Sequence, residues 1–239
     1  MLADSEVHRA LVVTAHPDDV DFGAGATMAS WRQQGIEVTY CIVTDGDAGG
    51  FDPTVPRAQI PSIRRAEQTA AAAACGVTDV RFLGYRDGEL TVSHDLRRDI
   101  SRVIRQVRPQ RVVIQSPERN WERIYSSHPD HLAAGEAAIQ AVYPDARNPF
   151  AHPTLLQDEG LEDWAVPEVW VMAAKDPNHF VDVTDFFDAK IAALRAHESQ
   201  TGHMDDLVER IEGWLTTNAK AAGFDQGRLA EAFMVVSTA

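Results

Sequence analysis

The sequence predicts an α/β protein with a Rossmann-like, mainly parallel sheet, helices on both faces and a less regular C-terminal part. Three observations support this class. Short apolar or β-branched runs alternate with longer helix-like segments, the connections have the length of β-α-β crossovers, and polar residues follow the first apolar run directly. In such sheets ligands bind at the carboxyl ends of the strands, so residues that follow a strand are the first candidates for a site.

The first half of the chain shows the alternation most clearly. Apolar, β-branched composition predicts strands over residues 7–15, 36–44, 80–83 and 111–115. The intervening segments have helical composition and predict helices over residues 22–34, 63–75, 96–107 and 129–142. Gly35 and Gly76 stop the first two helices, and Pro109 follows the third. The loop 45–56 is rich in Gly, Asp and Pro, and is either a substrate loop or a surface turn.

The second half is less regular. Residues 144–165 have little periodicity, and we expect them to form an excursion around the site. Apolar runs predict strands over residues 168–174, 180–184 and 233–237, and composition predicts helices over residues 185–197 and 206–222. Because no repeat or linker interrupts the chain, residues 1–239 are expected to form one domain.

Composition and charge limit the partners. The 239 residues carry a formal net charge of −14 and no basic stripe that could follow phosphates or anionic lipid. The first ten residues lack the apolar core of a signal peptide, and no apolar run approaches the roughly 18 residues of a membrane span. We therefore expect a cytoplasmic protein that acts on a small molecule, with no nucleic acid or membrane partner. A homo-oligomer is compatible with the sequence. Cys41 and Cys75 predict two buried free thiols.

Two distant segments carry the residue types of a metal site. His16, Asp18 and Asp19 follow the first predicted strand, and His128 and His131 lie at the start of the helix after the fourth. His131, His16 and one carboxylate form a three-ligand set that suits Zn²⁺ and leaves a position for water or substrate. Fe²⁺ is an alternative ion for these ligands, and spacing alone does not choose between Asp18 and Asp19. The remaining histidines lack a paired partner and are expected at the surface or in packing: His8, His94, His152, His179, His197 and His203.

A dinucleotide-binding module, either an oxidoreductase or a sensor, is the competing class. Gly23 and Gly25 follow the first strand, and Asp45 ends the second, where a ribose-binding acid would lie. The fingerprint is incomplete, because Met28 occupies the position of its third glycine and four polar residues separate the strand from the glycines. The partial motif is equally consistent with close helix packing.

The motifs AHPDD (residues 15–19) and HPDH (residues 128–131) resemble those of the LmbE-like, or PIG-L, family. This is a family of zinc-dependent N-acetylglucosaminide deacetylases, which includes enzymes of mycothiol and bacillithiol synthesis. Further similar stretches extend the resemblance from Val12 to about Gln200: TDGDAGG, IRRAEQ, FLGYRDGEL and VDVTDFFDAKIAALRAHESQ. The resemblance implies a hydrolase that removes an acetyl group from the amide nitrogen of an N-acetylglucosamine-type sugar conjugate. An amidase for a larger acyl or thiol-conjugate amide is the alternative.

The resemblance also assigns roles to the residues of the two motifs. The implied zinc ligands are His16, Asp19 and His131. Asp18 is implied as the general base, and His128, supported by Asp130, as an acid or oxyanion stabiliser. These roles fit the chemistry of amide hydrolysis, because zinc activates water, a free carboxylate can move the proton of that water, and a histidine can carry positive charge beside the oxyanion.

Substrate contacts follow from the resemblance as well. Arg64 and Asp87 are implied as contacts to sugar hydroxyls, with Asp47 as a weaker candidate. Arg65 could take the place of Arg64. Outside the motifs, Asp21 stands where many relatives carry glutamate and is expected to support the strand–helix turn, while the role of Tyr125 stays open.

Overall fold

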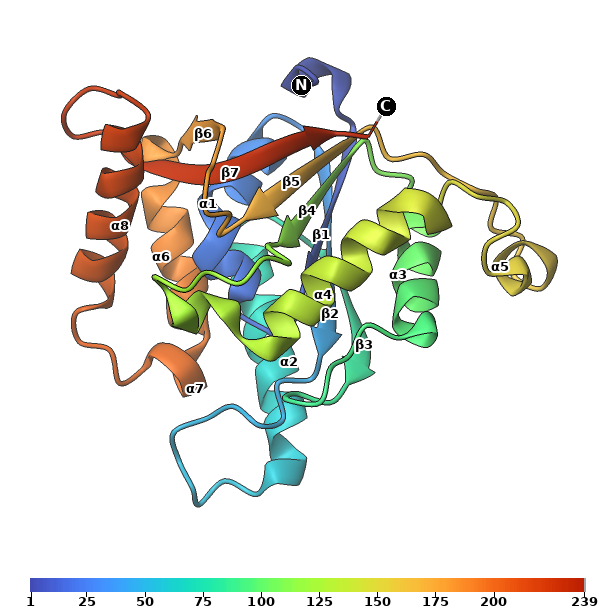
Figure 1. Ribbon diagram of the computed structural model, residues 1–239. Helices are drawn as coiled ribbons and strands as arrows, with labels where there is room; N and C mark the ends of the chain where they lie inside the picture. The colour runs from blue at the N-terminus through green and yellow to red at the C-terminus, as the bar shows by residue number, and fades with distance from the viewer. Residues whose placement is uncertain (239) are drawn as a thin grey trace.

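The computed structural model describes residues 1–238 and contains a seven-stranded sheet with the order β3-β2-β1-β4-β5-β7-β6 (Figure 1). The strands are β1 (Arg9–Thr14), β2 (Glu37–Thr44), β3 (Asp79–Tyr85), β4 (Arg111–Gln115), β5 (Glu168–Met172), β6 (His179–Asp182) and β7 (Ala230–Ser237). Strands β1 to β5 are parallel, and β7 runs antiparallel between β5 and β6. The predicted α/β class with a mainly parallel sheet is confirmed.

Helices cover both faces of the sheet (Figure 1). They are α1 (Asp19–Gln33), α2 (Ile60–Ala74), α3 (His94–Val107), α4 (Pro129–Gln140), α5 (Pro153–Gln157), α6 (Phe187–Ala196), α7 (Glu198–Thr201) and α8 (Leu207–Ala221). On β1, Leu11 and Val13 pack with α3 and α4, whereas Ala10 and Val12 pack with α1 and α2. This burial on both faces explains why the parallel strands read as continuous apolar runs.

The strand order places the loops after β1 and β4 side by side. From β1 the chain moves to β2 and β3 on one side, and it then returns to the other side of β1 to form β4. In a doubly wound sheet, ligands bind at the carboxyl edge where this reversal occurs. The two histidine-containing segments follow β1 and β4, so the topology alone brings them together.

Helix α1 begins at Asp19, three residues before the predicted start at Phe22. Gly23 and Gly25 consequently lie inside the helix. A Cβ atom on Gly23 would stand 2.6 Å from Sδ of Met172, so this glycine permits close helix–strand packing. The glycines do not form a phosphate-binding turn, and the dinucleotide-binding alternative loses its structural basis.

The expected excursion of residues 144–165 around the site is wrong. This segment packs near the amino-terminal ends of the strands, away from the site. There Nε1 of Trp164 donates to the carbonyl of Pro109, just before β4. Arg105, near the end of α3, holds the segment by donating to five of its carbonyl groups: those of Asp145, Ala146, Asn148, Ala151 and Leu161. Sequence periodicity did not indicate this anchor, because the partners of Arg105 are backbone atoms.

The prediction for the two cysteines is confirmed. Cys41 and Cys75 are free and buried. Among the described residues, no helix combines the length and the apolar composition that a membrane crossing requires.

Candidate metal centre

The turn between β1 and α1 presents His16, Asp18 and Asp19 at the carboxyl edge of the sheet. Asp18 has a left-handed backbone, with φ of 96° and ψ of −29°. Such a conformation costs a non-glycine residue about 1–3 kcal/mol and persists where neighbours enforce it. Here the carbonyl of Asp18 accepts from the amide of Asp21 at 2.9 Å, and its own amide donates to Oε1 of Gln68 at 2.8 Å. The structure thus holds Asp18 in a strained position beside His16 and Asp19.

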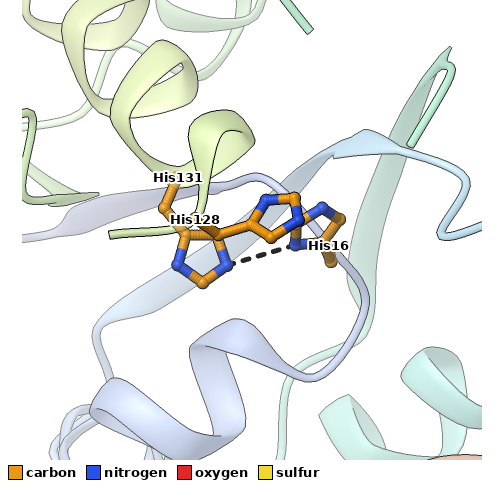
Figure 2. A group of neighbouring side chains, drawn as sticks. All are labelled: His16, His128 and His131. Atoms are coloured by element: carbon orange, nitrogen blue, oxygen red, sulfur yellow. Dashed lines mark hydrogen bonds between the residues drawn. The ribbon is translucent and has the colours of Figure 1, made fainter. Parts of the chain in front are cut away.

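His131 lies in the first turn of α4 and faces this turn across the sheet edge (Figure 2). Its Nε2 atom is 3.2 Å from Nδ1 of His16 and 3.0 Å from Oδ1 of Asp19. Nδ1 of His16 is 3.3 Å from Oδ2 of Asp19. Two imidazole nitrogens and both oxygens of the Asp19 carboxylate, from two distant segments, therefore lie close together.

The three separations suit a tetrahedral zinc ion. Ligand atoms about 2.0–2.1 Å from such an ion stand about 3.3 Å apart, close to the separations observed here. Two imidazole nitrogens that face each other need a proton or a cation between them, and the adjacent Asp19 carboxylate favours positive charge. The residues His16, Asp19 and His131 thus fit a divalent metal.

The opposite edge of the His16 ring faces two carboxylates. Its Nε2 atom is 3.0 Å from Oδ1 of Asp87 and 3.2 Å from Oδ2 of Asp130. His16, Asp87 and Asp130 could also form a metal-binding group. We favour the other ring edge, because Asp130 already accepts from the amides of Gly88 (2.7 Å) and Leu90 (3.2 Å). A histidine that binds metal through one nitrogen commonly donates through the other to a carboxylate, which fixes its ring.

Asp130 contacts both His128 and His16. The hydrogen bond expected between His128 and Asp130 is present and comes from the backbone amide of Asp130, while the carboxylate of Asp130 contacts His16. The amide of Asp130 donates to Nδ1 of His128 at 3.2 Å. His128 precedes the first turn of α4, so its ring caps the helix while the Asp130 side chain reaches across to the loop after β3.

His128 stands beside the converging atoms. Its ring centroid is 4.9 Å from that of His16, and a nitrogen of each of His16, His128 and His131 lies within 4.8 Å of the other two. Burial, together with positive charge on His16 and His131, holds the pKa of His128 below its usual range. With Nδ1 accepting a hydrogen bond, the neutral ring carries its proton on Nε2. A neutral His128 with this tautomer can donate a hydrogen bond from Nε2, and its role as acid or oxyanion stabiliser stays a prediction.

The charge around His16 is strongly negative. Burial disfavours its imidazolium form, but Asp19, Asp130 and Asp87 outweigh this effect and raise the pKa of His16 to about 12. On Asp19, burial favours the neutral acid, yet His131 and His16 hold its pKa well below the usual range. Surroundings of this kind stabilise a cation.

Asp18 differs from its neighbour Asp19. Burial raises the pKa of Asp18 to about 6, although Arg64 opposes the shift. Nη2 of Arg64 donates to Oδ2 of Asp18 at 3.0 Å and to the carbonyl of Pro17. A carboxylate whose pKa lies near neutral pH, and which is not among the three converging groups, has the properties of a general base.

Residues expected to contact sugar hydroxyls have partners inside the protein. Arg64 is only 3% exposed and holds Asp18, because α2 packs beneath the β1–α1 turn. Asp87 contacts His16 and accepts from the amide of Ala48 at 3.3 Å. The structure thus shows positioning contacts for both residues, and their contacts to sugar hydroxyls stay a prediction.

Two further candidates lie in the loop after β2 and in α2. Asp47 accepts from Arg57 at 2.8 Å and from the amide of Asp87 at 3.0 Å. Arg65 is 2.6 Å from Asp45 and more exposed than Arg64. A role for Asp47 in substrate binding stays a prediction.

A buried network behind Asp18 was missed by sequence reasoning. Oδ2 of Asp21 lies 2.8 Å from Nε2 of His197 and accepts from Nε2 of Gln68 at 2.8 Å, while Gln68 also binds the amide of Asp18. We expected His197 at the surface or in packing. It is fully buried, and its contact with Asp21 was not part of that expectation. The sequence carries no signal for the pairing, because 176 residues separate Asp21 from His197.

Replacing Gln68 by leucine is expected to slow the predicted hydrolysis and to lower the stability of the protein. The change leaves the amide of Asp18 without its partner and removes one of the two contacts of Oδ2 of Asp21, which costs about 1–3 kcal/mol of unfolding free energy. Because Gln68 does not touch the substrate, kcat should fall while KM changes little. Steady-state kinetics and denaturant unfolding measure both effects. Gln33→Leu, at an exposed position in α1, is the matched control, and an unchanged kcat in Gln68→Leu contradicts the positioning role.

The comparisons with known proteins agree with this geometry. Residues 11–142, more than half of the chain, match the family model described as PIG-L, GlcNAc-PI de-N-acetylase. The chain belongs to the PIG-L family. The range that matches the PIG-L model contains both the β1–α1 turn and the start of α4, so the resemblance inferred from the two motifs is confirmed.

Individual PIG-L relatives extend the match over nearly the whole chain. The diacetylchitobiose deacetylase of Thermococcus kodakarensis is 34% identical over 97% of this chain and 84% of its own length. A probable N-acetyl-alpha-D-glucosaminyl L-malate deacetylase 2 of Bacillus cereus is 34% identical over 84% of this chain and 88% of its own. The structure of N,N'-diacetylchitobiose deacetylase from Pyrococcus horikoshii, complexed with its inhibitor MPG, matches with a TM-score of 0.88 at 30% identity, covering 98% of this chain and 85% of that chain.

Proposed function

We propose that this protein is a metal-dependent N-deacetylase that hydrolyses the acetamide of an N-acetylglucosamine-type sugar conjugate. The observation that carries the proposal is the convergence of His16, Asp19 and His131 at separations of 3.0–3.3 Å, with Asp18 beside them. The names of the relatives support the substrate class, because they are deacetylases of diacetylchitobiose and of N-acetylglucosaminyl malate.

The three converging residues would hold the metal, with Zn²⁺ as the proposed ion and Fe²⁺ as the alternative. Such an ion supplies water activation and polarises the carbonyl group. Asp87 and Asp130 fix the ring of His16 through Nε2, so that Nδ1 keeps its direction.

Asp18 is proposed as the general base. It takes a proton from the attacking water and delivers a proton to the departing amine nitrogen. Arg64 and the strained backbone fix the direction of the Asp18 carboxylate. A pKa of about 6 lets Asp18 be ionised at neutral pH and still accept a proton readily.

His128 is proposed to stabilise the oxyanion. The proton on its Nε2 atom can be donated to the carbonyl oxygen as that oxygen gains negative charge. The helix cap holds the ring, because Nδ1 accepts from the amide of Asp130. A neutral donor needs no change of protonation before the reaction.

Removing the metal tests the proposal. After dialysis against a chelator, release of amine from N,N'-diacetylchitobiose is expected to fall by more than about 100-fold, because water activation is lost. Adding one equivalent of Zn²⁺ should restore it, with elemental analysis following the metal content. The proposal fails if the chelated protein keeps full activity, or if metal-loaded protein releases no amine from any N-acetylglucosaminyl compound.

We further propose that residues 1–239 act as one catalytic domain in the cytoplasm and that the partner is a small amino-sugar conjugate. A single cooperative unfolding transition, monitored with and without Zn²⁺, would support the single domain.

A further inference from the structure

An apolar pocket of about 300 Å³ opens beside the proposed metal ligands. Asp19 and His131 form one end of the pocket. Its walls are mainly apolar and aromatic and include Phe22 of α1, Met172 at the end of β5, Trp214 of α8, and Tyr125 of the loop before α4. The hydrolysis described above assigns no role to this pocket.

The pocket lies on one side of the metal ligands, and the polar groups lie on the other. Met172 ends β5, whereas Asp47 and Asp87 follow β2 and β3, and the strand order places β1 with His16 between the two sides. The carbonyl carbon of an amide carries its acyl chain and its nitrogen in opposite directions. Sugar hydroxyls need hydrogen-bonding partners, so the sugar nitrogen belongs on the polar side and the acyl chain in the pocket.

The pocket is too large for an acetyl methyl group. An apolar cavity of about 150 Å³ is enough to hold benzene, and pockets for small ligands begin near 300 Å³. A methyl group would leave most of the apolar wall against water. A straight chain of several methylenes would cover the side chains of Phe22, Met172 and Trp214.

The pocket also has an end. It adjoins a second space of about 220 Å³, which shares Phe22 and Trp214 with it and has Lys175, Asn218 and Glu231 in its lining. An apolar chain that reached this space would cover the ammonium group of Lys175 without offering it a hydrogen bond. The apolar section therefore suits a chain of intermediate length.

We infer that the enzyme hydrolyses N-acyl amino sugars whose acyl chain is longer than acetyl, with hexanoyl as the representative chain, and that this chain lies in the pocket between α1, β5 and α8. The inference rests on the proposed function and keeps its chemistry. The oxygen of water bonds to the acyl carbon, the carbon–nitrogen bond breaks, the amine takes a proton, and a hexanoate ion leaves.

A series of N-acyl glucosamines tests the inference. The zinc-loaded protein is assayed for amine release from acetyl, butanoyl, hexanoyl and decanoyl derivatives. Each methylene moved from water into the pocket contributes about fourfold to kcat/KM, so the hexanoyl compound should exceed the acetyl compound by at least about tenfold, with a decline at decanoyl. A hexanoyl value below the acetyl value overturns the inference.

A pair of tryptophan variants locates the chain. Trp214→Ala removes one wall of the pocket. It is expected to lower kcat/KM for the hexanoyl compound at least fivefold more than for the acetyl compound, because the loss of contact with about one methylene or more has an effect of this size. Trp121→Ala is the control, because Trp121 is 81% exposed and lies outside the pocket lining. If Trp214→Ala lowers kcat/KM equally for both substrates, the acyl chain lies elsewhere and its assignment to this pocket is overturned.

Binding of the product gives a readout without turnover. Calorimetric titration of the zinc-loaded wild-type protein should show hexanoate binding at least about tenfold more tightly than acetate, since both share the carboxylate and differ only in the chain. Equal affinities contradict the pocket assignment. If acetyl compounds are cleaved and hexanoyl compounds are not, the inference fails alone. If no compound is cleaved, the proposed function fails, and the titration still decides whether the pocket binds the chain.

Discussion

Asp18→Asn is expected to lower kcat by about 10²–10⁴-fold while the protein keeps its metal. The amide has nearly the shape of the carboxylate, and asparagine tolerates the left-handed backbone that Asp18 adopts with φ of 96°. The substituted side chain cannot accept the proton of the attacking water. Because the three converging residues are unchanged, the metal content should equal that of the wild type.

Kinetics and elemental analysis of the same preparation measure this result. Asp205→Asn, at an exposed position before α8, is the matched control and should behave like the wild type. Wild-type rates in Asp18→Asn would refute the assignment of the base. A protein that loses its metal would instead place Asp18 among the ligands and exchange its role with that of Asp19.

His131→Ala and His128→Ala are expected to have different consequences, although the two residues are three positions apart. His131 is one of the three converging side chains, so its loss should remove most of the metal and nearly all activity. His128 supplies a proton donor beside the site, so its loss should leave the metal in place and slow kcat by about 10²–10³-fold.

Each variant serves as the control for the other, since both truncate an imidazole at the start of α4. Metal content measured after gel filtration separates the two roles. Retention of metal by His131→Ala together with its loss from His128→Ala would reverse the assignment. Adding excess Zn²⁺ to the assay should partly restore His131→Ala, if the remaining two ligands bind weakly, and leave His128→Ala unchanged.

Much of the fold could be predicted because its signals are local. The apolar runs of β1, β2 and β4 are continuous, since these strands are buried on both faces, and the helices between them end at Gly35, Gly76 and Pro109. The position of β7 could not be predicted. An apolar run indicates a strand, but its antiparallel insertion between β5 and β6 depends on packing against α8 and α1.

The pairing of the two histidine motifs could likewise be predicted, because both follow strands of one parallel sheet. The supporting residues could not. The structure shows that Arg64 holds Asp18 and that the carboxylate of Asp130 contacts His16, and the sequence indicated neither contact. In each case the residue type was identified from the sequence, but the direction of its side chain was fixed by an element distant in the chain.

The sequence by itself determined the α/β class, the two motifs and the kind of chemistry, because strand burial, helix stops and ligand types are properties of short segments. Only the tertiary structure decided which nitrogen of His16 faces His131, that Gln68 links Asp18 to Asp21, and that an apolar pocket adjoins the site. These features arise from contacts between side chains far apart in the sequence. Their geometry depends on how the helices pack on the sheet, and no local pattern records that packing.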